Sequence, residues 1–261
     1  MKLRQFQVDA FAARPFEGNP AAVVPLANWL PDELMQSIAM ENNLAETAFF
    51  TPEGEGFRLR WFTPAVEVNL CGHATLATAH VLYKHLNWRQ DAVHFFTRSG
   101  KLTVSQVSDQ AYAMDFPADF AQKVDTLPAI VTGLGLEPLE VFRGKDDYMA
   151  VLSDEELIID LQPDFRAIRN LESRGLIVTA PGKEVDFVSR CFFPQSGIDE
   201  DPVTGSAHTV MTPYWAEKLG KSSLQARQLS RRKGDVGCIL SGDRVILEGR
   251  AVTVIEGVLT I

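Results

Sequence analysis

The chain has 261 residues, of which 46% are apolar and 23% charged, a composition typical of a globular protein with one large core or two smaller ones. Its net charge of −9 argues against a general nucleic-acid binder, because phosphate contacts need clustered lysine and arginine. The one basic run, Arg231-Arg232-Lys233, is short enough to be a solvated turn.

No apolar stretch reaches the length of a membrane span, and the first residues lack the apolar core of a signal peptide. We therefore expect a cytoplasmic protein with neither a nucleic acid nor a membrane as its partner. The three cysteines, Cys71, Cys191 and Cys238, show no metal-ligand spacing, and we interpret them as reduced thiols.

The first half of the chain alternates strand patterns with two helical patterns. Phe6, Val8 and Ala10 alternate with polar residues as in a half-buried strand, and the proline- and glycine-rich segment 14–20 is a loop. A helix expected over 73–86 is apolar almost all round, which predicts a helix enclosed by strands. The other elements expected here are strands at 21–24, 47–51, 57–62, 93–107 (with a turn at Ser99-Gly100) and 111–116, and a helix over 31–40.

The second half repeats this order after a connection expected within 119–135. Pro213 lies inside its long helical pattern and should kink the helix. The elements expected in this half are strands near Val141, Val151, Ile177 and Val188, a helix over 206–219 and strands up to Ile261.

Two segments, 57–86 and 187–219, match in outline. Each begins with the pattern Phe-x-x-Arg-x-Phe-x-Pro and continues to a glycine, a polar residue and an alanine before an apolar run. The prolines are 130 positions apart and the glycines 133, close to half of the chain length, which indicates a tandem duplication. The matching residues are Arg60, Pro64 and Gly72 in the first segment and Arg190, Pro194 and Gly205 in the second.

We therefore predict an α+β fold of two pseudo-symmetric domains, each a curved, mostly antiparallel sheet wrapped around a buried central helix. The expected halves are 1–118, joined by the last C-terminal strand, and 119–261. Two such halves that face each other would leave a cleft between equivalent loops.

Each expected buried helix starts just after or at a glycine. The first amides of a helix have no intrahelical partner, and the helix dipole favours an anion there. Glycine also allows close approach of a ligand to the backbone. We expect the amides of Gly72, His73, Gly205 and Ser206 to hold one substrate carboxylate from both sides.

Reactive side chains cluster around these helix starts. The segment 199–208, DEDPVTGSAH, places three carboxylates beside one helix start, and His73 lies at the other. Glu46, in ENNLAETAFF, lies at the edge of a short apolar strand. A carboxylate in such a place is suited to carry protons, and a histidine can relay a proton or donate a hydrogen bond.

The segments VDAFAARPFEGNPAAVV, ENNLAETAFF, NLCGHATLATA and DEDPVTGSAH resemble, in order and over nearly the whole chain, the signature segments of the phenazine-biosynthesis PhzF-like family. The resemblance implies a diaminopimelate-epimerase-like fold, commonly a homodimer, and a cofactor-independent isomerase. The best-understood reaction of the family is isomerisation of trans-2,3-dihydro-3-hydroxyanthranilate.

Carried over to this chain, the resemblance assigns catalytic roles to four residues. Glu46 is the main acid/base, which takes a proton from one carbon of the substrate and returns it to another. His73, Asp201 and Ser206 orient the substrate and support the transfer. No metal ion and no cofactor are expected, because no ligand spacing, phosphate loop or dinucleotide fingerprint is present.

Each of these residues also has a purely structural interpretation. Glu46 can pair or cap at a strand start, and His73 can make a structural hydrogen bond. Asp201 can be a turn residue and Ser206 a helix-start hydroxyl. A protein that binds a small acid without catalysis is therefore an alternative hypothesis.

A second alternative is an epimerase or racemase of an amino or imino acid. Racemases of this fold use two facing cysteines as base and acid. Cys71, just before Gly72, stands where the first cysteine would be, but the second helix start has no cysteine. Cys191 and Cys238 lie in strand-like segments and are expected to be small core residues.

Overall fold

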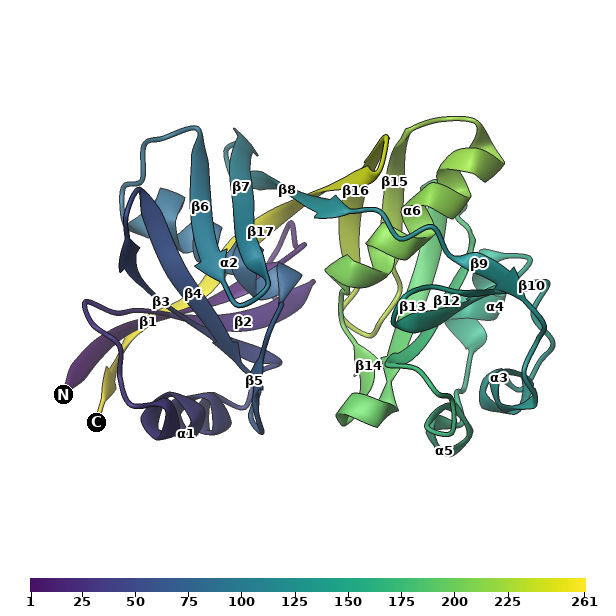
Figure 1. Ribbon diagram of the computed structural model, residues 1–261, viewed down its shortest axis with the longest axis horizontal. Coiled ribbons are helices and arrows are strands. Elements are labelled where there is room, and N and C mark those ends of the chain that lie inside the picture. The colour runs from purple at the N-terminus through teal and green to yellow at the C-terminus, as the bar shows by residue number, and fades with distance from the viewer. The chain divides into compact units, whose positions relative to one another are not determined.

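The computed structural model describes residues 1–261, and the chain divides into two compact units. Unit 1 contains Met1–Asp115 and Glu248–Ile261, and unit 2 contains Phe116–Leu247. The chain leaves unit 1 within one strand, Ala111–Pro117, and returns to it within the last strand, Arg244–Thr260. Figure 1 shows both units as sheets with a helix packed against them. None of the helices combines the length and apolar character that a membrane span requires.

Unit 1 is a sheet that closes around one helix. β1 pairs with β2 and β17, β2 with β3, β3 with β4, β4 with β6, β6 with β7, β7 with β8, and β8 with β17. The β2–β3 and β4–β6 pairs are parallel. The elements are β1 (Lys2–Ala10), β2 (Asn19–Pro25), α1 (Asp32–Asn42), β3 (Glu46–Glu53), β4 (Gly56–Phe62), β5 (Glu67–Val68), α2 (Gly72–His85), β6 (Ala92–Thr97), β7 (Gly100–Ser108), β8 (Ala111–Pro117) and β17 (Arg244–Thr260).

The helix α2 is the core of unit 1. Every residue from His73 to Tyr83 is buried, and the helix packs against β1, β2, β3 and β7. The alternation of Phe6, Val8 and Ala10 on β1 is confirmed, because all three side chains are fully buried. The sequence prediction of an all-round apolar helix enclosed by strands is thus confirmed.

Unit 2 repeats this arrangement around α6. The β11–β12 and β13–β15 pairs are parallel, as are their counterparts in unit 1, and the remaining neighbours are antiparallel. The segment 119–135, expected as a connection, contains a strand and a helix. The elements are β9 (Gln122–Val124), α3 (Pro128–Leu134), β10 (Glu140–Arg143), β11 (Asp147–Val151), α4 (Glu155–Asp160), α5 (Phe165–Ile168), β12 (Gly175–Pro181), β13 (Phe187–Phe193), η1 (Pro194–Ser196), β14 (Ile198–Asp201), α6 (Gly205–Leu219), β15 (Ser223–Gln228) and β16 (Gly234–Ser241).

The repeated Phe-x-x-Arg-x-Phe pattern has one structural role in both units. Arg60 on β4 donates from Nε and Nη2 to both carboxylate oxygens of Glu67, at 2.7 and 2.8 Å. Arg190 on β13 donates in the same way to Glu200, at 2.7 and 2.9 Å. Each guanidinium also lies over the phenylalanine two residues later, 5.1 and 5.2 Å from the ring centroid. These paired contacts explain why the pattern occurs twice.

Pro213 is accommodated inside α6. A proline has no N–H, so the carbonyl four residues earlier, that of Thr209, loses its helical donor. In the structure this carbonyl accepts a hydrogen bond of 3.1 Å from the backbone N–H of Asp119. The helix runs from Gly205 to Leu219 through the proline.

Candidate active site

Unit 1 brings Glu46 and His73 into direct contact. Glu46 is the first residue of β3, and His73 is the second residue of α2. Nε2 of His73 lies 2.9 Å from Oε2 of Glu46, and the two side chains are only 7% and 12% exposed. This buried Oε2 nevertheless lacks a hydrogen bond of good geometry, so the contact is an ion pair by distance.

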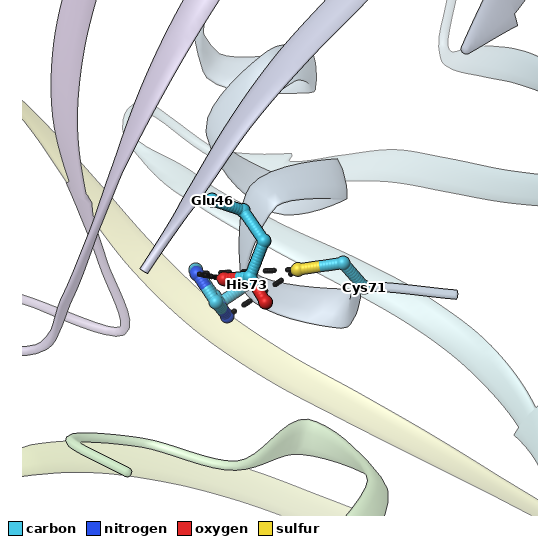
Figure 2. Close-up of side chains that lie close together, drawn as sticks. All are labelled: Glu46, Cys71 and His73. Carbon is cyan, nitrogen blue, oxygen red and sulfur yellow. Dashed lines mark hydrogen bonds and ion pairs between the residues drawn. The ribbon is translucent and has the colours of Figure 1, made fainter. Parts of the chain in front are cut away.

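Cys71 is the third member of this cluster (Figure 2). Its Sγ lies 3.5 Å from Nδ1 and 3.9 Å from Nε2 of His73. Burial, reinforced by the negative charge of Glu46, raises the pKa of the Cys71 thiol to about 11. Cys71 is therefore a neutral thiol at neutral pH.

The surroundings of His73 favour its protonated form. Burial alone would lower its pKa, but attraction to the Cys71 sulfur and the Glu46 carboxylate outweighs burial, and the pKa of His73 is raised well above its ordinary value. The direction of this shift favours the imidazolium form of His73 beside Glu46.

Both central helices begin without a side-chain cap. The N-cap of α2 is Cys71 and that of α6 is Thr204, and neither side chain accepts from a backbone amide. The short helices α4 and α5, by contrast, are capped by Asp154 and Asp164. The first-turn amides of α2 and α6, which include those of Gly72, His73, Gly205 and Ser206, are therefore suited to an external anion.

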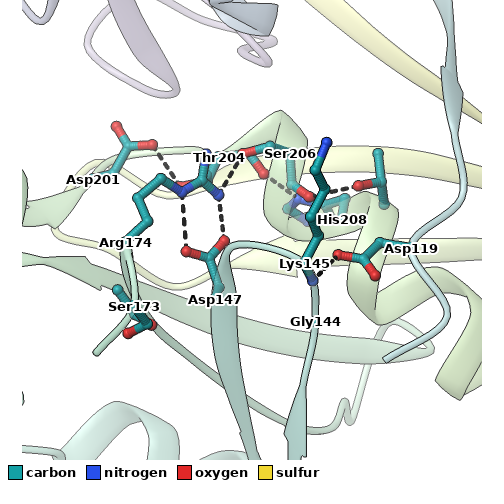
Figure 3. A network of polar contacts seen from close by, with 12 residues as sticks. Asp119, Gly144, Lys145, Asp147, Ser173, Arg174, Asp201, Thr204, Ser206 and His208 are labelled. Carbon is teal, nitrogen blue, oxygen red and sulfur yellow. Dashed lines mark hydrogen bonds and ion pairs between the residues drawn. The ribbon is translucent and has the colours of Figure 1, made fainter. Parts of the chain in front are cut away.

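The start of α6 carries a charged residue that the sequence analysis missed (Figure 3). Arg174 donates from Nη2 to Oγ of Ser206 at 3.0 Å. The same guanidinium donates from Nε to Asp147 at 2.9 Å and from Nη2 to the other oxygen of that carboxylate. Asp147 is 1% exposed whereas the Arg174 side chain is 39% exposed. A buried acid thus holds a partly exposed cation beside Ser206.

Asp201 has a structural partner in unit 2. Its carboxylate accepts a hydrogen bond from the hydroxyl of Thr204, and its backbone carbonyl accepts one of 2.7 Å from Gln228. Gln228 also accepts from the backbone N–H of Thr204 at 2.8 Å. These bonds fix the loop that leads into α6. A catalytic role for Asp201 stays a prediction.

The strand register shows why the two units differ chemically. Phe49 lies opposite Arg60, and Val178 lies opposite the equivalent Arg190. Three residues earlier on each strand, the counterpart of Glu46 is Gly175, where a Cβ would come within 2.2 Å of the Phe193 ring. Unit 2 therefore has no room for a second Glu46, and it has Arg174 next to that position. Extending the repeat to these strand starts would have found Arg174.

The chain shares its fold with a predicted epimerase. A predicted epimerase of Pseudomonas aeruginosa superposes with a TM-score of 0.73 at 20% identity over 99% of both chains. In sequence, an uncharacterised isomerase of the same organism is 51% identical over 257 residues, 98% of each chain. The fold and these relatives define an enzyme of the isomerase class.

The family is equally clear. The model of the phenazine biosynthesis-like protein family matches residues 8–257. A PhzF family phenazine biosynthesis protein of Enterococcus faecalis superposes with a TM-score of 0.97 at 45% identity over the whole of both chains. The chain belongs to the phenazine biosynthesis-like protein family, as the sequence segments predicted.

Proposed function

We propose that this protein is a cofactor-independent isomerase that moves a proton on a small carboxylate-bearing substrate, with Glu46 as the proton carrier. The observation that supports this best is the Glu46 carboxyl group, nearly buried and 2.9 Å from His73, whose pKa is raised, at the start of a buried helix. General acid/base catalysis needs such a positioned group with a nearby charge partner.

The reaction has two proton transfers. The Glu46 carboxylate accepts a proton from one carbon of the substrate and leaves a delocalised carbanion. The protonated Glu46 then returns the proton to another carbon, and the double bond shifts. His73 positions the carboxylate and, as an imidazolium, stabilises negative charge on the substrate.

The substrate we propose is a small cyclic or conjugated acid of the trans-2,3-dihydro-3-hydroxyanthranilate type. Its carboxylate would bind first-turn helix amides, for which we propose those of Gly72 and His73 beside Glu46. A contribution of the Gly205 and Ser206 amides stays a prediction of the sequence. In unit 2, Arg174 beside Ser206 offers a guanidinium suited to a carboxylate. Asp201 is proposed to support the transfer. The homodimer and the cytoplasmic location expected from the sequence stay predictions.

The experiment is to incubate the protein with trans-2,3-dihydro-3-hydroxyanthranilate in deuterated water and to follow the products by proton NMR. We expect a shifted double bond. The carbon that receives the proton keeps protium when Glu46 returns the abstracted proton directly, and it gains deuterium when the protonated Glu46 first exchanges with solvent. A panel of other small conjugated acids, run in parallel, extends the test to the substrate class. Absence of conversion and of exchange across the whole panel would contradict the proposal.

A second candidate is an epimerase of an amino or imino acid, favoured by the contact between Cys71 and His73. It would exchange the α-hydrogen of its substrate with deuterated water and interconvert the two epimers. The high pKa of the Cys71 thiol weighs against it, because a thiol is a poor base. Exchange at the α-carbon of an amino acid, lost in Cys71→Ser, would favour this candidate over the first.

A further inference from the structure

Three different metal-ligand types meet in the cluster of Glu46, Cys71 and His73. The carboxylate oxygen, the sulfur and the ring nitrogen that these residues offer all lie within 4.8 Å of one another. They come from two segments, the start of β3 and the turn into α2. No metal ion was expected from the sequence, because no ligand spacing is present and Glu46 is remote in sequence from the other two residues.

We propose that Glu46, Cys71 and His73 form a binding site for one thiophilic divalent cation, with Zn²⁺ as the natural ion of this class. In a tetrahedral zinc site with bonds of about 2.0–2.3 Å, neighbouring ligand atoms lie roughly 3.3–3.6 Å apart. In the structure Nε2 of His73 is 2.9 Å from Oε2 of Glu46 and 3.9 Å from Sγ of Cys71. The first distance is about 0.4 Å shorter and the second about 0.3 Å longer than this range.

The polar atoms of the cluster are poorly satisfied without a cation. The buried Oε2 of Glu46 has no hydrogen bond, and the Cys71 side chain does not cap α2. Oε2 has the ion-pair contact with His73 but no hydrogen bond of good geometry, and a bound cation would give this buried oxygen a directional partner. Three protein ligands leave the fourth tetrahedral position open to water or to a carboxylate.

The ligand set selects the ion. Sulfur and imidazole ligands favour Zn²⁺ and Cd²⁺, whereas Mg²⁺ and Ca²⁺ prefer oxygen alone. On binding, the Cys71 sulfur exchanges its proton for the metal, and any proton on the His73 ligand nitrogen is released as well. The Cys71 thiolate and the Glu46 carboxylate then neutralise the two positive charges of the cation inside unit 1.

Bound metal would occupy the lone pairs that proton transfer needs. If the proposed isomerase function holds, the bound cation inhibits the enzyme. Only this inhibition rests on the proposed function. The binding itself does not depend on turnover. Its test therefore uses binding as the readout, so that the two proposals can fail separately.

The experiment is a titration of metal-free, reduced protein with Cd²⁺, followed by ultraviolet absorption and calorimetry. A cadmium–thiolate bond gives a charge-transfer band that carboxylate or imidazole ligation alone does not. We expect one equivalent of Cd²⁺ to bind with this band, Zn²⁺ to compete for the site, and Mg²⁺ to leave it unaffected.

Variants assign the ligands. Cys71→Ser should abolish the band, whereas Cys238→Ala, which removes another buried thiol, should leave it unchanged. Glu46→Gln keeps the thiol and should lower the affinity by at least about 10–100-fold, the cost of losing even an outer-shell partner. No band in the wild type, a band retained in Cys71→Ser, or an unchanged affinity in Glu46→Gln would each overturn the proposal.

Discussion

Arg174 and Asp147 differ in burial more than any other ion pair described above, and this difference determines what each residue does. The Asp147 carboxylate is inaccessible and is satisfied by the guanidinium. The Arg174 side chain is partly exposed and lies over the ring of Phe193, 5.0 Å from its centroid. The buried Asp147 carboxylate holds the guanidinium in place, and the Arg174 guanidinium is the accessible group of the pair.

Arg174→Met should destabilise the protein, because it leaves Asp147 buried without a partner. Loss of one member of a fully buried pair costs about 3–5 kcal/mol. Since the Arg174 side chain is 39% exposed, we expect roughly 2 kcal/mol, measured by urea unfolding.

The matched control is Lys123→Met, which removes a lysine that is 64% exposed and paired with Glu140. Its cost should stay below about 1 kcal/mol, as for other exposed pairs. Equal costs for the two variants would show that burial of Asp147 does not matter.

The sequence revealed Glu46 and His73 more readily than Arg174. Glu46 and His73 belong to recognisable segments, and their contact follows from β3 and α2 packing in one unit. Arg174 lies in an ordinary polar turn, and its acid partner is 27 positions away. Its placement depends on strand register and on the space around Gly175, which no local pattern encodes.

At the scale of elements, each central helix buries a histidine that the proposed chemistry does not use. His80 on α2 contacts the hydroxyls of Tyr112 and Thr253, at 3.1 and 2.9 Å. His208 on α6 lies 2.8 Å from the carbonyl oxygen of Thr204. Burial lowers the pKa of each to about 4, so both are neutral at pH 7.

This burial predicts a loss of stability in acid. An unfolded histidine has a pKa near 6.5, so between pH 6.5 and pH 4 the unfolded chain binds more protons than the folded chain. The stability that His80 and His208 contribute is complete above pH 6.5 and is lost as the pH falls through 4. Each residue accounts for about 3 kcal/mol of that change.

The measurement is urea unfolding of the wild type and of His208→Gln over this pH range. Glutamine takes up no proton, so the variant should lose less stability on acidification, whatever its stability at pH 7. Parallel pH curves for the two proteins would contradict the assignment of a neutral buried His208.

The sequence predicted the long elements better than the short ones. The strand β1 shows an apolar alternation, and the helix α2 is apolar almost all round over many residues. The helices α4 and α5 have only six and four residues, too few to show an apolar period, and were missed. The aspartates that cap them were the available signal.

At the scale of the whole molecule, the two units are variants of one plan with different chemistry at the helix starts. The repeated arginines Arg60 and Arg190 preserve the plan, since each ties its strand to a glutamate on a short neighbouring strand. Sequence reveals such a duplication because the structural residues recur. The sequence repeat reveals the functional difference between the two units less well, because this difference lies at the positions where the repeats diverge.

The last strand completes unit 1 although it ends the chain. β17 pairs with β1 from Lys2↔Thr260 to Ala10↔Ala251. A chain that lacks residues 248–261 leaves the edge of β1 unpaired, so we expect unit 1 to unfold locally. Limited proteolysis should then cut within residues 1–115 much faster than in the full chain, and an unchanged cleavage rate there would contradict this role.

The central claim is that Glu46 carries the proton, and the most direct measurement is kcat/KM for deuterium-tracked isomerisation by Glu46→Gln. Glu53→Gln is the matched control, because it makes the same change at the other end of β3. Loss of a general acid/base should lower kcat/KM by about 100–10,000-fold in Glu46→Gln, with Glu53→Gln near the wild type. Wild-type activity in a folded Glu46→Gln variant would contradict the account.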